Sequence, residues 1–437
     1  MTLSHGYYVC FIIITIIVIS REKNYVSSTA IRSSALKSVV IIGGGFGGLY
    51  TALKLNELLT TKLKEKEVCI TLVDPKDKFI FLPLLYEFCI ENAAIQEVGP
   101  TYQRLLENLN INFVQDTVDD IDINSNEIRL NSKRVLKFDK AVIAVGSQPR
   151  VDIIKGAKEL SLPFYRIEDA YKLRTSLKYL KSSEKEHIRV VVIGGGYSGV
   201  EIATNVAEYL GENRAKITIV HRNDAIMHSS PTFNREVAEK SLNVLKIASR
   251  LNSSVIEVMK EGVMIQHNLA DTTEFVPADL VISTFGVQAS KLVEGISGLQ
   301  KDKNNRLRTN RYLQSLDQEN IYALGDCSCI DNMLVPSTAQ VAIQQAEVVA
   351  NNILTDDSNF QPFTFVNLGE MLTLGGKDGA ISSLSGLVQI DGHLASIARR
   401  IIYAARMPTN SQKITALIGS SLVMGNKLIK ENILDKK

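Results

Sequence analysis

The sequence predicts an α/β protein with two Rossmann-like dinucleotide-binding domains and a C-terminal amphipathic, membrane-associating region. Two glycine-rich motifs, GGGFGG at 43–48 and GGGYSG at 194–199, each follow an apolar run that is typical of a buried strand. Both have the G-x-G-x-x-G pattern, in which the glycines permit a tight turn, a close approach of a pyrophosphate and close packing of the next helix. The N–H groups at that helix's start face the phosphates. The pattern glycines are Gly43, Gly45 and Gly48, and then Gly194, Gly196 and Gly199.

The residue that follows the second strand differs between the two motifs. The strand 69–73 ends in Asp74, and an acid at this place hydrogen-bonds a ribose hydroxyl. The strand 216–220 is followed by His221 and Arg222, and an arginine here can meet the 2′-phosphate of NADP. We therefore predict FAD at the first motif, and NADPH or NADH as electron donor at the second. The alternative is that His221 and Arg222 are a solvated strand end.

Later strands complete the same pattern. The strand 138–145 leads into Gly146, and the strand 280–285 is its counterpart after the second motif. The strand 320–324 is followed by Gly325 and Asp326, where a carboxylate can hold the ribityl chain of a flavin; the alternative is an ordinary turn. The predicted domains are an FAD-binding domain in two parts, 38–160 and 290–355, and an NAD(P)H-binding domain, 161–289.

Composition restricts the class of protein. With 437 residues, 45% hydrophobic and 22% charged, the chain can form a large core, and its net charge of +2 gives no reason to expect nucleic acid as a partner. The five cysteines show neither a disulfide framework nor zinc spacing, so no metal site is predicted. Cys327 and Cys329 are interpreted as buried or loop thiols, with a metal or redox pair as the alternative.

The first 37 residues are predicted to be a targeting leader. The apolar run 9–19 is shorter than the ~20 residues of a spanning helix and suits the core of a signal peptide. The basic, serine-rich stretch 21–37 is typical of an organelle transit peptide. Together they favour a plastid, with the mitochondrion as an alternative. A membrane anchor or a wrongly assigned start remains the other interpretation of this segment.

The C-terminal region, 356–437, contains two amphipathic segments. In 394–406, apolar residues share one helical face while Arg399, Arg400 and Arg406 lie around the other. In 414–433, an apolar face is opposed by lysines, and its uncharged part is too short to span a bilayer. This pattern predicts a peripheral attachment to a membrane surface, with the apolar faces in one leaflet and the arginines and lysines at the head groups. The alternative is docking against the body of the protein or against a second subunit, as in a homodimer.

The order of these motifs resembles the two-dinucleotide flavoprotein superfamily. Within it, AQVAIQQ at 339–345 resembles the A-Q-x-A-x-Q motif of type II NAD(P)H:quinone oxidoreductases, and FLPLLY at 81–86 looks like that family's P-L-L segment. The stretch 367–375 is similar to the plastid and mitochondrial branch of alternative NAD(P)H–ubiquinone oxidoreductases. The resemblance covers roughly residues 38 to 430.

The resemblance implies a function. Hydride would pass from NAD(P)H to FAD, and two electrons would then pass, without proton pumping, to a prenylated quinone in the membrane. Plastoquinone, ubiquinone and a phylloquinone precursor such as demethylphylloquinone all fit. Gln340 and Gln344 would lie near the isoalloxazine and the quinone head, and Glu201 near the nicotinamide. His221 stands where many NADH-preferring members carry an acid, so a preference for NADH is not predicted.

Other activities share the two motifs. A sulfide:quinone reductase needs redox cysteines against the flavin, and Cys327 and Cys329 keep this alternative open. A ferredoxin-type reductase would lack the amphipathic C-terminal region. A flavin-binding signalling protein without enzymatic activity is the alternative of another class, and it predicts slow oxidation of NAD(P)H.

Overall fold

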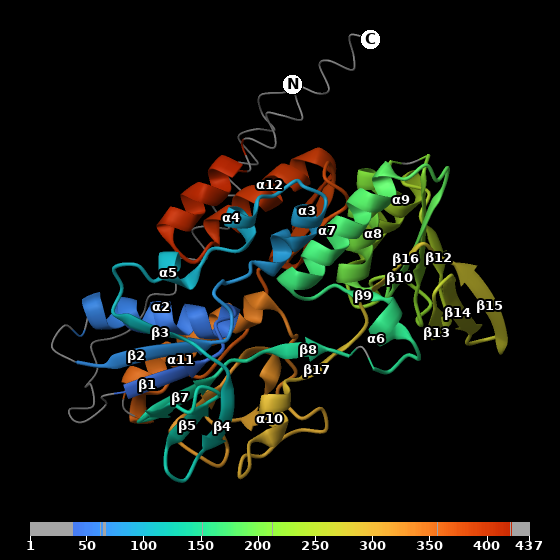
Figure 1. The fold of residues 1–437 in the computed structure, drawn as a ribbon. Helices are drawn as coiled ribbons and strands as arrows, with labels where there is room; N and C mark the ends of the chain where they lie inside the picture. Colours follow the sequence, from blue (N-terminus) through green and yellow to red (C-terminus); the bar gives the residue numbers. More distant parts are fainter. Residues whose placement is uncertain are drawn as a thin grey trace.

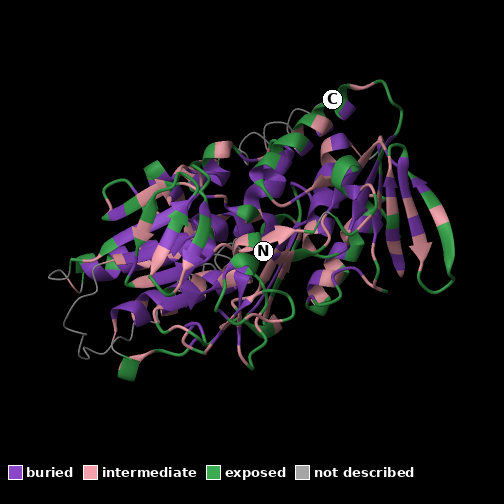
Figure 2. Ribbon diagram, turned by 60° about the horizontal axis from the view of Figure 1, so that its bottom comes forward, coloured by how far each residue is buried: buried purple, intermediate pink, exposed green. Residues whose placement is uncertain are grey.

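The computed structural model describes residues 38–421 except 62, 64–66, 151, 212, 356 and 420. The predicted leader and the larger part of the predicted segment 414–433 lie outside the described residues. Two parallel sheets, each with its own helices, form the two halves of the molecule, and the C-terminal elements lie across the top (Figure 1). Figure 2 shows the buried residues concentrated in the strands of both sheets and in the helices that cover them.

The first sheet has the order β19-β7-β1-β2-β3, and all of its pairings are parallel. Parallel strands are covered on both faces, which is why their sequences are almost continuously apolar. One face packs against the helices α2 (Phe46–Thr61) and α11 (Ala339–Leu354), and the other against α10 (Lys291–Gly295) and a small antiparallel sheet. The strands are β1 (Ser38–Ile42), β2 (Cys69–Asp74), β3 (Ile111–Gln115), β7 (Lys140–Ile143) and β19 (Ile321–Ala323).

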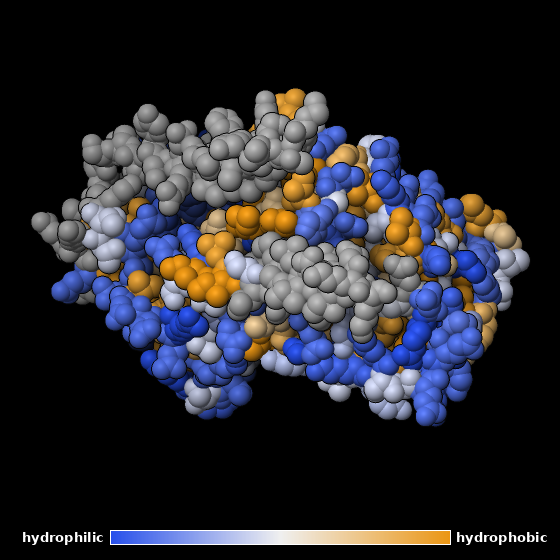
Figure 3. All heavy atoms as spheres, turned by 90° about the horizontal axis from the view of Figure 1, so that it is seen from above, coloured by the Kyte–Doolittle hydropathy of each residue, from blue (hydrophilic) through white to orange (hydrophobic). Residues whose placement is uncertain are grey.

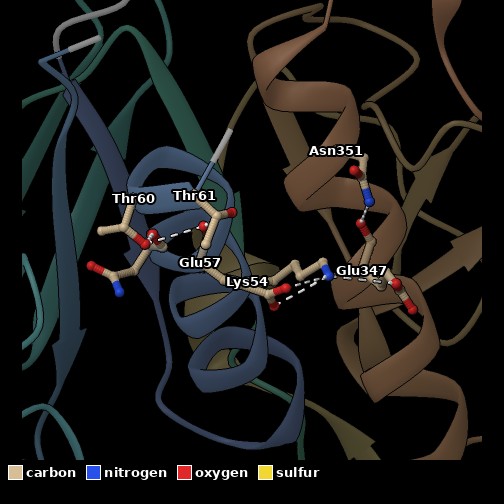
Figure 4. A network of polar contacts seen from close by, with 7 residues as sticks. Lys54, Glu57, Thr60, Thr61, Glu347 and Asn351 are labelled. Atoms are coloured by element: carbon tan, nitrogen blue, oxygen red, sulfur yellow. Dashed lines mark hydrogen bonds and ion pairs between the residues drawn. The ribbon is translucent and has the colours of Figure 1, made fainter. Parts of the chain in front are cut away.

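The helices α2 (Phe46–Thr61) and α11 (Ala339–Leu354) lie side by side although they are distant in sequence (Figure 4). Lys54 on α2 bridges them, with its Nζ 3.2 Å from Glu57 of the same helix and 3.8 Å from Glu347 of α11. Because α11 and β19 both come from the last third of the chain, the first domain is built from two separate stretches of sequence.

The second sheet has the order β12-β11-β10-β16-β9 and is also parallel. Its strands are β9 (Leu162–Pro163), β10 (Ile188–Ile193), β11 (Ala215–Val220), β12 (Ala248–Arg250) and β16 (Leu280–Ser283). Its helices are α6 (Ala157–Leu160), α7 (Ile167–Ser182), α8 (Tyr197–Leu210) and α9 (Thr232–Val244). An antiparallel sheet of β13 (Ser253–Met259), β14 (Gly262–His267) and β15 (Thr272–Pro277) extends outward from it (Figure 1).

An antiparallel ribbon connects the two halves. It pairs β8 (Ser147–Pro149), where the chain leaves the first domain, with β17 (Val287–Ala289), where the chain returns. The remaining elements of the first domain are α3 (Leu85–Cys89), α4 (Ile95–Val98), α5 (Tyr102–Leu105), β4 (Val118–Asp122), β5 (Glu127–Leu130), β6 (Val135–Lys137), α10 (Lys291–Gly295), β18 (Leu307–Thr309) and β20 (Ser328–Ile330).

The C-terminal region is a folded part of the body. It consists of a sheet of β21 (Glu370–Thr373), β22 (Gly379–Ser383) and β23 (Val388–Asp391), followed by α12 (Gly392–Ala405) and a helix over 410–419. The helix 410–419 is held by the buried Gln412, whose Nε2 donates to the carbonyl of Gln96 at 2.7 Å. No helix in the described part of the chain combines the length and the apolar character needed to cross a bilayer.

The prediction that the arginines of 394–406 face head groups is wrong for Arg399 and Arg400. Both are buried, and both form ion pairs with the buried Glu87 of α3. The physical reason is that a helix beside a buried carboxylate can place its arginines inward, where charge is compensated. Most of the apolar face of this helix also turns inward: Ala398 and Ile402 are buried beside Ile381, as the docking alternative predicted, and Leu394 is exposed.

Candidate functional site

A cavity of about 560 Å³ runs from the first glycine motif, past the ends of both sheets, to α12. Its walls include the first motif and β2, the segment 80–86, the turns at 144–147 and 324–326, the segment 164–167, the starts of α8 and α11, and the C-terminal strand β21 and helix α12. The cavity therefore joins the first predicted nucleotide site to the helix of the second motif and to the C-terminal region. The pattern glycines of the second motif, His221 and Arg222 do not line it.

Both glycine motifs have the backbone geometry of a pyrophosphate site. Gly43 and Gly194 have φ of +98° and +113°, a left-handed conformation that favours glycine. A Cβ on Gly48 would overlap the carbonyl oxygen of Gly43, so only glycine allows helix α2 to pack this closely on β1. Gly199 and Gly194 repeat the relationship at the second motif.

The middle glycine of each motif faces open space. No heavy atom lies within 4 Å of a Cβ built on Gly45 or on Gly196. Because the helix N-termini follow directly, these open positions fit a phosphate group held by backbone N–H groups. The residues present thus fit a dinucleotide at each motif.

Asp74 lies in the cavity beside the first motif. Its Oδ2 accepts a hydrogen bond from the N–H of Gly44 at 2.7 Å, and its Oδ1 accepts one from the N–H of Lys76 at 2.8 Å. Burial raises the pKa of Asp74, and the two backbone donors oppose that rise. The carboxylate is therefore held in a fixed orientation against the cavity, as a contact with a nucleotide ribose requires.

Asp326 lies in the same cavity at the end of β19. Its Oδ2 accepts a hydrogen bond from Oγ of Ser147 at 2.9 Å, and that hydroxyl also lies 2.7 Å from the hydroxyl of Tyr165. Gly146 and Gly325 precede these polar residues with φ of +64° and +72°, and both line the cavity. The turns after β7 and β19 thus present hydroxyl and carboxylate groups to the cavity, as a contact with a flavin chain would require.

Glu201 lies at the other end of the cavity, on α8. Its Oε1 accepts a hydrogen bond from the N–H of Thr373 at 3.0 Å. Burial raises the pKa of Glu201 to about 7, so the carboxyl can gain or lose a proton near neutral pH. Tyr86, Tyr403 and Met371 line the same end. Tyr86 and Met371 lie in the stretches 81–86 and 367–375 that carry the family resemblance, but the sequence analysis assigned none of the three a role at the site.

His221 and Arg222 lie at the end of β11, next to the second motif. Nδ1 of His221 accepts a hydrogen bond from the N–H of Gly195 at 3.1 Å, so this nitrogen carries no proton. Burial and the neighbouring Arg222 and His228 lower the pKa of His221, which favours the same neutral form. Arg222 is exposed. The pair is therefore a positioned histidine beside an arginine open to a ligand.

Gln340 and Gln344 bind a backbone segment beside α11. Neither lines the large cavity. Gln340 exchanges hydrogen bonds with the backbone of Leu368 and Gly369, and Gln344 pairs with both backbone groups of Val366. The two amides hold the segment that leads to β21, because a glutamine side chain can match a backbone donor and acceptor. Their contact with a quinone stays a prediction.

The cysteine pair does not form a redox site at the cavity. Cys327 is buried, and its Sγ lies against the carbonyls of Ile143 and Leu324; Cys329 lies outside the large cavity. No cysteine among the described residues lines that cavity, and no metal-binding group of acids, cysteines or histidines occurs among them. The geometry thus gives no support to the sulfide:quinone reductase alternative.

The sequence analysis did not predict the buried charges beside the cavity, which belong to Glu87, Arg399 and Arg400. A signal for them was present, because Glu87 interrupts an apolar run after 81–86, and Arg399 and Arg400 are adjacent within an apolar helix. A charge at a core position of a segment predicts a buried partner elsewhere in the chain. The sequence does not say which partner, because the two segments are far apart.

Comparisons with known proteins agree with this geometry. The profile of the pyridine nucleotide-disulphide oxidoreductase family matches residues 37–346. The demethylphylloquinone reductase NdbB of Synechocystis is 38% identical over 88% of this chain and 95% of that protein. The alternative NAD(P)H-ubiquinone oxidoreductase C1, chloroplastic/mitochondrial, of Arabidopsis thaliana is 34% identical over 86% of this chain and 78% of that protein. The structure of NDH2 from Plasmodium falciparum in complex with NADH has the same fold, with a TM-score of 0.77, 19% identity, and coverage of 88% of this chain and 98% of that one.

Proposed function

This chain belongs to the pyridine nucleotide-disulphide oxidoreductases, within them to the type II NAD(P)H:quinone oxidoreductases, and on that premise we propose that it transfers electrons from NAD(P)H to a prenylated quinone without pumping protons. The observation that carries the proposal is the single cavity that joins the first glycine motif, the helix of the second motif and the C-terminal helix α12. Bound FAD supplies the two-electron chemistry between donor and acceptor.

The residues of the chain have separate tasks in this reaction. Asp74 and the open face at Gly45 would hold the adenosine and pyrophosphate parts of FAD, and Asp326 the ribityl chain. The open face at Gly196, together with Arg222, would hold the nicotinamide nucleotide. Both NADH and NADPH are proposed as donors, because Arg222 can contact a 2′-phosphate and the position directly after β11 is a histidine, His221, and not an acid that would repel this phosphate.

The quinone would enter at the end of the cavity near α12. Leu82 and Pro83 of the first domain, and Tyr403 of α12, line this end. Glu201 lies there too, and burial raises the pKa of this carboxyl to about 7. Gln340 and Gln344 would support the site indirectly, by holding the segment from which Met371 reaches the cavity wall. Among the quinones that fit, a demethylated naphthoquinone is the first candidate, because the relative with 38% identity is named for it.

Attachment to a membrane surface is part of the proposal. Six large apolar side chains of the C-terminal region are exposed, and we call them the apolar rim: Leu384, Leu387, Leu394, Ile414, Leu417 and Ile418. Seen from above, exposed apolar side chains gather on the face that carries α12 (Figure 3). Since Tyr403 of α12 lines the cavity, this helix would lie between lipid and the quinone site. A plastid location and a homodimer also remain predictions.

A quinone panel with the purified protein in lipid vesicles tests the proposal. Each quinone is offered with NADH and with NADPH, and reduction and reoxidation of the flavin are followed separately by absorbance. We expect both donors to reduce the flavin and a prenylated naphthoquinone to reoxidise it fastest. Reduction by neither donor, or reoxidation by none of the quinones, would contradict the assignment and favour the non-enzymatic flavoprotein.

A further inference from the structure

A buried group of charges lies between α3 and α12, behind the wall of the cavity. Glu87 and Arg399 are each 1% exposed, and Arg400 is 5% exposed. Both arginines form ion pairs with Glu87, one to each of its carboxylate oxygens. Removing three charges from water is costly, and well-packed apolar residues often stabilise such a place at least as well. The group therefore calls for an explanation other than stability.

The charges adjoin the end of the cavity that holds Glu201. Tyr86 precedes Glu87 on α3, and Tyr403 follows Arg399 by one turn of α12; both tyrosines line the cavity together with Glu201. The guanidinium carbon of Arg399 lies 5.2 Å from the ring centre of Tyr403. Nε and Nη1 of Arg399 are buried and have no hydrogen-bond partner among the described residues. Arg399 is thus a cation directly behind the reaction space, and Glu87 is the anion that compensates it.

The groups that act on Glu201 come from three neighbouring elements. Tyr86 and Glu87 act from α3, Arg399 from α12, and the N–H of Thr373 from β21. Burial has the largest effect on Glu201 and raises its pKa. The hydrogen bonds from Thr373 and Tyr86 and the charge of Arg399 lower that pKa, and the charge of Glu87 raises it. Tyr403 faces both Arg399 and Glu201, with Arg406 also acting on it, and burial raises the pKa of Tyr403 to about 12. The two members of the ion pair therefore act on Glu201 with opposite sign.

We propose that Glu87 is a positioning residue for proton delivery: it holds and compensates Arg399 so that the carboxyl of Glu201 can carry a proton to the quinone. This rests on the proposed function. Converting a quinone to its quinol takes two electrons and two protons. NAD(P)H supplies two electrons and one proton as hydride. The second proton comes from Glu201: its O–H bond breaks, an O–H bond forms at the quinone oxygen, and the carboxylate takes a proton from water.

Charge-neutral variants test this role. In Glu87→Gln, the charge of Arg399 is no longer compensated and should lower the pKa of Glu201. In Arg399→Gln, the pKa of Glu201 should rise. Each shift should be about one pKa unit, as expected for a nearby charge. The double variant should return close to the wild type. A residue with a merely structural role would not give opposite shifts that cancel.

Two measurements read the pKa of Glu201. The first is the infrared C=O stretch of the protonated carboxyl, followed against pH in the protein without donor or quinone and assigned by its loss in Glu201→Gln. The second is the pH profile of flavin reoxidation by quinone. Glu91→Gln is the matched control, because Glu91 lies near Glu87 in sequence but pairs with Arg174 and Lys178 at the surface. That control should leave both midpoints unchanged.

The outcomes separate this inference from the proposed function. If quinone is reduced but the infrared midpoint does not move in Glu87→Gln, the role of Glu87 is overturned and the function stands. If the midpoint moves as expected but no quinone is reduced, the function fails and the electrostatic coupling stands. Should Glu87→Gln not fold, Glu87→Asp, which withdraws the carboxylate from Arg399 by one methylene, must shift the midpoint in the same direction, and an unchanged midpoint there would again overturn the inference.

Discussion

The backbone N–H of Thr373 donates a hydrogen bond to Oε1 of Glu201 at 3.0 Å, although 172 positions separate the two residues. It fastens β21 of the C-terminal region to α8, the helix of the second glycine motif. Further contacts run along the same helix, from Tyr197 to Glu370 and from the N–H of Gly376 to Glu208. The C-terminal region therefore packs on α8 and forms part of the cavity wall, through Met371 and Tyr403.

Replacing Asp326 by alanine should release flavin while the fold survives. The carboxylate accepts a hydrogen bond from Ser147 inside the cavity and lies where a ribityl chain would pass. The ratio of flavin to protein after gel filtration measures the effect, and circular dichroism reports the fold. Asp119→Ala, an exposed acid on β4, is the control and should keep its flavin. Full flavin content in the Asp326 variant would show that this residue does not hold the flavin.

The middle and last glycines of the second motif, Gly196 and Gly199, should respond differently to alanine. Gly196→Ala places its Cβ in open space, so it should leave stability unchanged and weaken NAD(P)H binding. Gly199→Ala forces a Cβ onto the carbonyl of Gly194, and overpacking of this kind costs about 1–3 kcal/mol of the free energy of unfolding, or more. Thermal unfolding and titration with NADPH distinguish the two. Equal loss of stability in both variants would contradict the assignment of Gly196 to the ligand.

Nucleotide preference should change in Arg222→Glu. An acid at the end of β11 repels a 2′-phosphate and accepts hydrogen bonds from the ribose diol. A hydrogen bond to a charged group contributes about 1.5–3 kcal/mol, so the ratio of kcat/KM for NADH to that for NADPH should rise about tenfold or more. Lys240→Glu, on the exposed side of α9, makes the same change of charge away from the site and should keep the wild-type ratio. An unaltered ratio in the Arg222 variant would show that the strand end is merely solvated.

Acidic substitutions in the apolar rim should detach the protein from membranes. The triple change Leu394→Glu, Ile414→Glu and Ile418→Glu alters exposed side chains and spares the buried Arg399 and Tyr403. We expect less co-sedimentation with vesicles and a larger loss of turnover with long-tailed quinones than with short soluble ones. Binding of the wild type should persist partly at high salt, because apolar burial is not screened as charge contacts are. If the triple variant co-sediments with vesicles as well as the wild type does, the apolar rim is not the attachment site.

The sequence by itself determined the two dinucleotide folds. The glycines of both motifs, the acid after β2 and the apolar strands are local patterns, since the turn, the helix start and the strand they specify lie within about thirty residues of one another. Asp74 and Asp326 could therefore be assigned to a flavin site from their places after strands. The amphipathic pattern of 394–406 likewise predicted a helix, although most of its apolar face packs against the body of the protein, with Ala398 and Ile402 beside Ile381.

Only the tertiary structure decided which partners the polar residues meet. A glutamine pair at helical spacing is compatible with a quinone or with a backbone segment, and the fold placed Gln340 and Gln344 against 366–369. Arginines opposite an apolar face are typical of a helix at a membrane surface. In the fold, however, Arg399 and Arg400 are buried and form ion pairs with Glu87 of a helix that is distant in sequence. Local pattern sets the conformation of a segment, whereas the partner of a buried charge depends on which segments pack together, and packing is a property of the whole chain.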